Sequence, residues 1–176
     1  MEIEWATTES FRRITVAQLR PILDVLVKID WPCSASRIPV IMERLGWVFI
    51  SDQVDAHSDT LLPFNYTVGA FSHPDGIFTR LGFPASDYVD SSDSVAIQAV
   101  RNAFPLVVRD MESILGPQSH TEADLSGVAW DLDSGGRVRL DNINIGLHAW
   151  VLSQDIADAE RYTEANDMSD YYDDDE

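Results

Sequence analysis

The sequence predicts an α+β fold, in which helices pack on one face of a mainly antiparallel β-sheet within a single domain. Three observations predict this fold. Two segments alternate apolar and polar residues around a glycine-containing turn, and other segments repeat apolar residues at helical spacing. The 176 residues can bury one sizeable core, and no repeat or linker divides them. We therefore expect one domain over residues 1–165, followed by an acidic, disordered tail over residues 166–176.

An amphipathic helix is predicted near the start of the chain. Thr15 and Gln18 have the spacing of a capping box, and apolar residues then recur at helical spacing. A proline is tolerated in the first turn of a helix, where its missing N–H has no partner to lose. Because Pro21 lies inside this pattern, we expect the regular helix to begin near Arg20.

A second, shorter helix and a strand follow. The apolar pattern predicts a helix over residues 38–45, with Ser36 as its cap and Gly46 as its end. The apolar run of residues 47–50 then predicts a short buried strand. The polar, turn-rich residues 51–60 are expected to form a loop.

A hairpin is predicted next. Residues 62–72 are rich in aromatic and β-branched side chains, and residues 73–76 have the proline and glycine of a reverse turn. Residues 77–81 form the return strand. Gly69 lies inside the first strand, where a bulge is favoured over the close approach of a neighbouring group.

The second half of the chain begins with a loop over residues 82–93. The longest predicted helix follows over residues 94–115, and Gly116 and Pro117 end it. Pro105 should kink this helix, because it removes a hydrogen bond to the preceding turn.

A second hairpin and a final helix complete the predicted fold. Alternation over residues 128–132 resumes on even positions after the glycine turn of residues 134–136. At Asp141 and Asn142 the apolar positions switch to odd numbers, which requires either a bulge or a second turn. A helix over residues 154–164 follows.

Composition limits the classes of function. The chain has 12 basic and 30 acidic residues and a net charge of −18, which disfavours nucleic acid and anionic membranes as partners. A basic protein partner and simple solubility explain this charge equally well. Cys33 is the only cysteine, which excludes an internal disulfide. With no signal peptide or membrane-spanning run in the sequence, we expect a cytoplasmic protein.

Catalytic motifs are not found. The sequence has no glycine-rich phosphate loop, nucleophile elbow or paired-histidine zinc helix. The best metal candidate comprises Asp52, Asp55, His57 and Asp59, which do not have the spacing of a calcium loop and are interpreted as part of a solvated loop. His148 is expected on the outward face of a strand. We therefore expect no enzyme activity, no cofactor, no metal and no small-molecule substrate.

Three sequence pieces together resemble an uncharacterised actinobacterial domain family that includes an immunity factor. They are residues 45–47 (LGW), the hairpin of residues 130–140 (WDLDSGGRVRL) and residues 157–161 (ADAER). The similarity spans essentially the whole chain. It implies a cytosolic antitoxin that binds a secreted NAD+ glycohydrolase domain, one to one, and blocks its NAD-binding active site. It implies no residue-level motif for inhibition.

Candidate partner-binding residues therefore come from physical arguments. A tight inhibitor needs an interface of about 1,600 Å² with aromatic anchors near its centre. The hairpin of residues 64–75 offers such anchors and a slender backbone at Gly69, although it could equally be a half-buried part of the sheet. The predicted contact residues are Phe64, Tyr66, Val68, Gly69, Ala70, Phe71, His73, Pro74 and Asp75.

Two alternative functions stay open. A cytosolic chaperone for a secreted client would also be acidic, but it would leave the activity of its client intact. A metal-dependent hydrolase would use the acidic segment of residues 52–59. The acidic tail could also steer association with a basic toxin.

Overall fold

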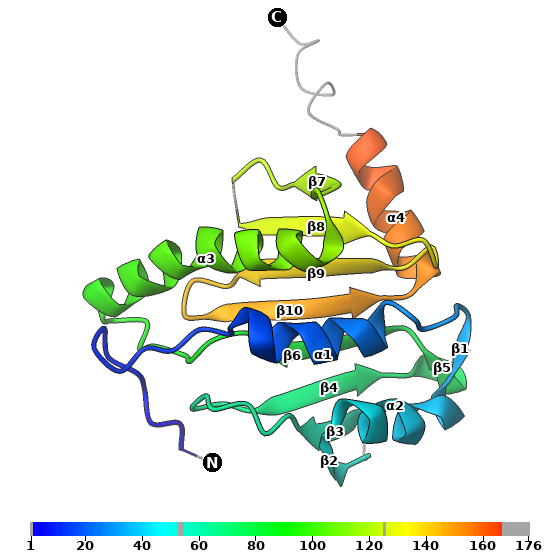
Figure 1. Ribbon diagram of the computed structural model, residues 1–176, viewed down its shortest axis with the longest axis horizontal. Helices are drawn as coiled ribbons and strands as arrows, with labels where there is room; N and C mark the ends of the chain where they lie inside the picture. The colour runs from blue at the N-terminus through cyan, green and yellow to red at the C-terminus, as the bar shows by residue number, and fades with distance from the viewer. Residues whose placement is uncertain (1, 53–54, 125, 167–176) are drawn as a thin grey trace, which may run out of the picture.

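An antiparallel sheet of eight strands forms the frame of the protein in the computed structural model, which describes residues 2–52, 55–124 and 126–166 (Figure 1). The strand order is β2-β3-β4-β6-β10-β9-β8-β7, and β1 and β5 form a separate two-stranded sheet. The strands are β1 (Cys33–Ser34), β2 (Val48–Ser51), β3 (Ala56–Asp59), β4 (Val68–Ser72), β5 (Ile77–Phe78), β6 (Arg80–Pro84), β7 (His120–Thr121), β8 (Gly127–Asp131), β9 (Arg137–Asn142) and β10 (Leu147–Leu152). The predicted α+β single domain with an antiparallel sheet is confirmed.

Four helices pack against this sheet. They are α1 (Val16–Leu26), α2 (Ile38–Leu45), α3 (Ser94–Leu115) and α4 (Gln154–Ala165). The first three cover one face and bury the main core between themselves and the sheet (Figure 1). α4 contacts the opposite face. On β9, Val138 and Leu140 point into the core, so Arg137 and Arg139 point to the other face. There both arginines donate hydrogen bonds to Glu160 of α4. Within the described residues, no helix combines the length and the apolar character that a membrane span requires.

The start of α1 is set by its capping box. The hydroxyl of Thr15 accepts a hydrogen bond from the Gln18 N–H at 3.3 Å, and the Gln18 side chain accepts one from the Thr15 N–H at 2.9 Å. The helix therefore begins at Val16, and the predicted start near Arg20 is wrong. Pro21 removes one hydrogen bond from the helix. The helix tolerates this loss because four buried side chains hold it against the core.

α2 begins after a short 3₁₀ turn. Ser34, and not the predicted Ser36, caps this turn by accepting a hydrogen bond from the Ser36 N–H at 3.3 Å. Gly46 ends α2 in the left-handed conformation with φ 71°, as predicted. The chain then reverses into β2.

The region after α2 differs from the prediction in two ways. Residues 48–50 are exposed rather than buried, because β2 is the outermost strand of the large sheet. The predicted loop of residues 51–60 contains strand β3, whose inward Ala56 and Ser58 are buried. These inward side chains are small, so the apolar alternation that predicts strands is weak here.

The predicted first hairpin is present as β4 and β6, but its return strand begins at Arg80 and not at Ile77, because residues 77–78 form β5 and pair with β1. Its first strand begins at Val68, so residues 62–67 precede the sheet. The predicted bulge at Gly69 is wrong, since Gly69 pairs regularly with Ser58. The absent side chain instead makes room for an indole: a Cβ at Gly69 would lie 2.9 Å from Cζ3 of Trp47.

In the second half of the chain, the long helix, the glycine-turn hairpin and the final helix agree with the sequence pattern, whereas the short strand β7 was not predicted. Residues 143–146 form a second turn between β9 and β10, which explains the switch from even to odd apolar positions. α3 ends at Gly116 as predicted, and the kink predicted at Pro105 stays a prediction. The predicted loop of residues 82–93 begins later, because β6 continues to Pro84. The predicted disordered tail lies outside the described residues, except for Asn166 at the end of α4.

Candidate partner-binding surface

One edge of the large sheet presents apolar side chains to solvent. β2 pairs with β3, and its second edge makes no ladder within the described part of the chain. Val48, Phe49 and Ile50 are 53, 56 and 52% exposed. Proteins usually protect such edges with charges or proline, because an open apolar strand pairs readily with another strand. This edge is therefore the strongest candidate for contact with another protein.

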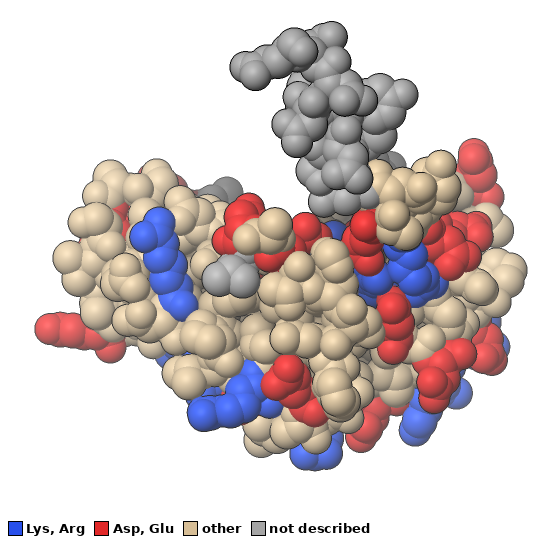
Figure 2. All heavy atoms as spheres, turned by 90° about the horizontal axis from the view of Figure 1, so that it is seen from above, with Lys and Arg blue, Asp and Glu red and all other residues tan. Residues whose placement is uncertain are grey.

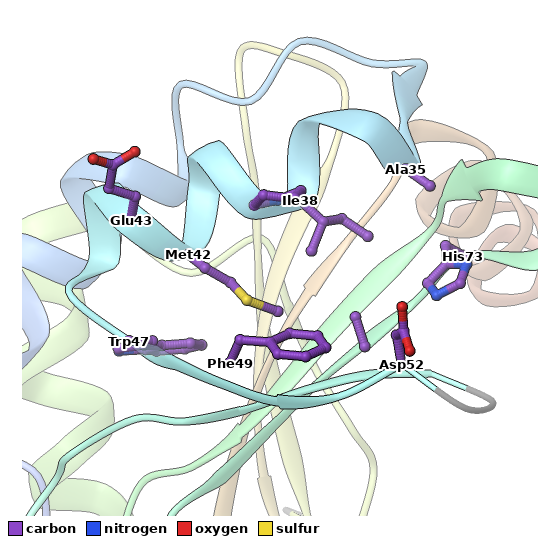
Figure 3. Close-up of a pocket in the computed structure, with 10 residues that line it drawn as sticks. Ala35, Ile38, Met42, Glu43, Trp47, Phe49, Asp52 and His73 are labelled. Carbon is purple, nitrogen blue, oxygen red and sulfur yellow. The ribbon is translucent and has the colours of Figure 1, made fainter.

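A pocket of about 550 Å³ lies beside this strand, between α2 and β2 (Figure 3). Met42 of α2 and Phe49 of β2 face each other across its apolar centre. Asp52 and His73 lie together at one end, and Glu43 lies at the other. An apolar centre with acidic groups at both ends suits an apolar or cationic side chain of a partner.

Trp47 positions the strand. It is 7% exposed and packs edge-on against Phe71 and Phe83, with ring centroids 6.0 and 5.6 Å apart. The backbone N–H of Trp47 donates to the Met42 carbonyl at 3.0 Å, which ties the start of β2 to the end of α2. Because Trp47 fills the space toward the core, the three residues after it remain outside.

The hairpin predicted to bind a partner divides between core and surface. Phe64, Gly69 and Phe71 are buried, so in this fold their role is to pack the core. The prediction of a slender backbone wedge at Gly69 loses its physical basis, because that position faces Trp47. Alternation along β4 is the reason: every second residue of a strand points to the same face.

The other predicted hairpin residues are accessible at least in part. Tyr66 stacks on Tyr88 with ring centroids 5.3 Å apart, and Val68 and Ala70 are half-buried. Pro74 and Asp75 are exposed in the turn of residues 73–76. His73, at the start of that turn, lines the pocket beside β2. We call β2, the pocket and this turn together the β2 surface. Whether the hairpin residues contact a partner stays a prediction.

The acidic segment predicted as a metal candidate does not converge on one point. His57 and Asp59 lie on β3, where Nδ1 of His57 is 3.4 Å from the Ser51 hydroxyl and the Asp59 carboxylate accepts a hydrogen bond from the Leu61 N–H at 2.9 Å. Asp52 lies in the pocket instead. The segment was predicted to be a solvated loop, and part of it is a strand. Its metal-dependent hydrolase interpretation gains no support.

His148 lies on the sheet face opposite the main core. Its Nδ1 is 3.0 Å from the Tyr88 hydroxyl, and its ring packs on Trp150 with centroids 4.6 Å apart. Burial lowers the pKa of His148 to about 4 and raises the pKa of Tyr88. His148 is therefore neutral at pH 7 and serves as a packed hydrogen-bonding group, which is more enclosed than an outward strand residue.

Sequence reasoning missed the pocket and the exposure of β2. The apolar run of residues 47–50 reads the same for a central strand and for an edge strand. The sequence therefore carries no signal that separates the two cases. The contribution of α2 to the pocket depends on packing and has no sequence signature.

The fold and the β2 surface define an α+β domain with one open, apolar edge strand beside a pocket. The chain belongs to a family of unknown function (DUF6301), which matches residues 17–153. The matched region contains all of α1 except its first residue, together with α2, β2, the pocket and the hairpin, and it ends just before α4. Searches of curated proteins and of solved structures found no match.

Proposed function

We propose that this protein is a cytoplasmic immunity protein, which binds a secreted NAD+ glycohydrolase toxin one to one and blocks its NAD-binding active site. The observation that carries the proposal of a binding protein is the open apolar strand β2 beside the α2 pocket. The choice of toxin rests on the resemblance, carried by residues 45–47, 130–140 and 157–161, to a domain family that includes the immunity factor for the tuberculosis necrotizing toxin. Its function is then binding, with no catalytic step of its own.

Strand addition is the mode of binding that this surface suits. An extended segment of the toxin would pair with the free edge of β2 through main-chain hydrogen bonds. Phe49 and Met42 would then accept one of its side chains in the pocket. A stable complex buries about 800 Å² on each partner, so neighbouring parts such as the turn of residues 73–76 would also take part.

Charge supports a basic partner. The chain carries a net charge of −18, and Glu43 and Asp52 lie at opposite ends of the pocket. A cationic toxin surface would be attracted over long range, which raises the association rate at low salt. The charge argument predicts only that the partner surface is positively charged, while the sequence resemblance suggests the class of partner.

The experiment is a titration of NAD+ consumption by the toxin domain with this protein, with complex formation followed by size-exclusion chromatography. We expect complete inhibition near one equivalent. Phe49→Asp should weaken inhibition at least tenfold, because it places a charge in the apolar centre of the interface. Val95→Asp is the matched control, since Val95 is also exposed, at 65%, but lies on α3 away from β2.

Two results would contradict the proposal. Equal inhibition by the wild type and Phe49→Asp would place the contact elsewhere on the molecule. A stable complex that continues to hydrolyse NAD+ would identify a chaperone, for which the same open strand would hold an extended segment of the client. Thermal unfolding of both variants should stay close to the wild type, because each replaces an exposed side chain.

A further inference from the structure

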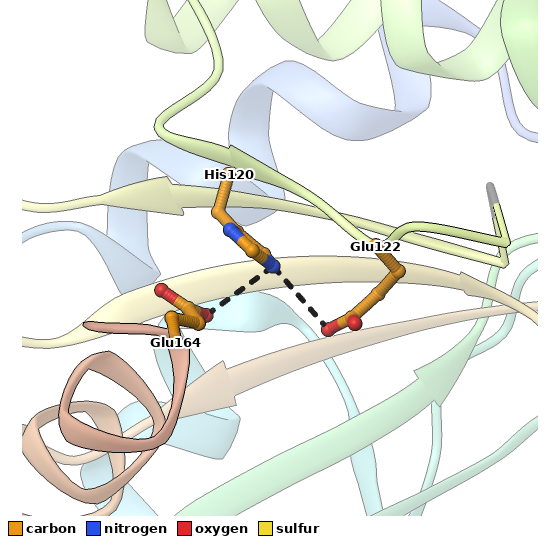
Figure 4. Close-up of side chains that lie close together, drawn as sticks. All are labelled: His120, Glu122 and Glu164. Atoms are coloured by element: carbon orange, nitrogen blue, oxygen red, sulfur yellow. Dashed lines mark ion pairs between the residues drawn. The ribbon is translucent and has the colours of Figure 1, made fainter. Parts of the chain in front are cut away.

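Three side chains with metal-binding atoms meet at the other edge of the large sheet (Figure 4). His120 lies on β7, Glu122 follows directly after it, and Glu164 lies in the last turn of α4. Nε2 of His120 is 3.7 Å from Oε1 of Glu122 and 3.7 Å from Oε1 of Glu164. All three ligand atoms lie within 4.8 Å of one another.

This spacing is close to that of a metal site. Zinc bonds of about 2.0–2.2 Å in a tetrahedral arrangement place neighbouring ligand atoms about 3.3–3.6 Å apart. Small side-chain rotations would therefore bring the three atoms around one cation. All three residues are partly exposed and line a hollow between β7 and α4, through which an ion can enter.

Two of these side chains are available for a ligand. Within the described part of the chain, the ring of His120 and the carboxylate of Glu122 make no hydrogen bond, and they meet other groups only at ion-pair distances of 3.7–3.8 Å. Arg139 contributes the longest of these contacts, at 3.8 Å from Glu122. A cation would thus replace weak contacts.

The third side chain is held in place from behind. Arg137, whose side chain is 1% exposed, donates to Oε2 of Glu164 at 3.1 Å and also to Oε1. A cation on Oε1 would leave the Oε2 bond intact, and the Nη1 group would keep Glu160 at 3.1 Å. Such an outer partner is what orients a metal-binding carboxylate in known sites.

The surrounding charge also favours a cation. The ion pairs around this site join more acids than arginines, and Figure 2 shows acidic and basic side chains interleaved on the surface seen from above. The acids of this network are Glu122, Asp131, Asp141, Asp158, Glu160 and Glu164. The arginines are Arg137, Arg139 and Arg161. A dication would offset the excess negative charge.

We propose that His120, Glu122 and Glu164 bind a divalent cation of the zinc class, which joins the end of α4 to the short edge strand β7. One imidazole nitrogen and two carboxylate oxygens are ligands that zinc prefers, and a water would complete the tetrahedron. The site lies at the opposite sheet edge from β2, so this proposal stands or falls separately from the proposed function.

Isothermal titration of the full chain with zinc chloride tests the proposal, and the visible absorption of bound Co²⁺ reports the coordination geometry. We expect one equivalent to bind more tightly than any other, with the absorption of a tetrahedral site. His120→Ala should lose this equivalent, and Glu122→Gln should weaken it at least tenfold. His57→Ala is the matched control, because it removes a half-exposed histidine from the other acidic segment.

Thermal unfolding supplies a second measurement. Zinc should raise the Tm of the wild type and of His57→Ala, because a ligand that binds only the folded state stabilises it, and it should leave the Tm of His120→Ala unchanged. Circular dichroism checks that both variants are folded. Weak binding at several sites that all variants share, or equal affinity of His120→Ala and the wild type, would overturn the proposal.

Discussion

Replacement of Gly69 by alanine tests how β2 is supported. An added Cβ would lie 2.9 Å from Cζ3 of Trp47, 3.1 Å from the Ser58 hydroxyl and 3.3 Å from Cγ2 of Thr60. Carbon atoms in contact normally lie about 3.5–4.0 Å apart, so the indole has to move. Trp47 packs on Phe71 in the core and leads into β2, so the substitution should disturb both.

The expected cost follows from overpacking. Inserting a methyl group into a filled core costs about 1–3 kcal/mol of unfolding free energy. For a chain of this length each kcal/mol lowers the Tm by about 2–4 °C, so Gly69→Ala should unfold about 2–12 °C below the wild type. Differential scanning calorimetry measures this shift, and urea unfolding gives the free energy.

A double-mutant cycle identifies the contact responsible. In a Trp47→Phe background the smaller ring should relieve part of the overlap, so Gly69→Ala should cost less there than in the wild type. An unchanged Tm for Gly69→Ala would refute the packing argument. If that variant also lost toxin inhibition, the hairpin would bind the toxin directly through Gly69, as the sequence first suggested.

Two further predictions concern buried polar groups. Arg137→Met should lower the free energy of unfolding by about 3 kcal/mol, at the low end for breaking a buried ion pair, because the carboxylate partners of Arg137 stay partly solvated. Urea unfolding measures this loss, and a change below about 0.5 kcal/mol would contradict the prediction. The hydrogen bond from Arg137 holds the pKa of Glu164 below its ordinary value, so this contribution is present at neutral pH and is lost as the pH falls through the lowered pKa. Arg137→Met should therefore lose less stability than the wild type as the pH falls below 4.5, the ordinary pKa of a glutamate. Burial lowers the pKa of His148 to about 4, so the unfolded state binds more protons and stability should fall by up to about 3 kcal/mol as the pH drops from about 6.5 to 4. His148→Gln should flatten this part of the pH profile, and an unchanged profile would show that His148 is solvated.

Local sequence signals predicted much of the fold. Gly46 places the end of α2, because a cap acts within one turn of chain. The capping box of Thr15 and Gln18 marks the true start of α1, although Pro21 shifted the predicted start to near Arg20. The switch of apolar parity at Asp141 and Asn142 predicts either a bulge or a second turn, and the structure has the turn between β9 and β10. These features depend on residues close together in sequence, so no tertiary information is needed to see them.

The prediction of the partner-binding surface was less complete. The hairpin was identified correctly as a reversal, but periodicity alone did not separate its buried Phe71 from its accessible His73. β3 was missed because Ala56 and Ser58 are small, so their burial leaves little apolar signal. The sequence similarity suggested a kind of partner without indicating which residues contact it.

By itself, the sequence determined the fold class, the helical segments, the C-terminal ends of α2 and α3, the glycine turns and the strongly acidic character of the chain. Only the tertiary structure decided that β2 is an open edge among the described residues, that Gly69 faces Trp47, and that the side chains of His120 and Glu164 lie close together. The reason is that turns, caps and periodicity act over a few residues. Strand order and the meeting of distant side chains depend instead on how all the elements share one core.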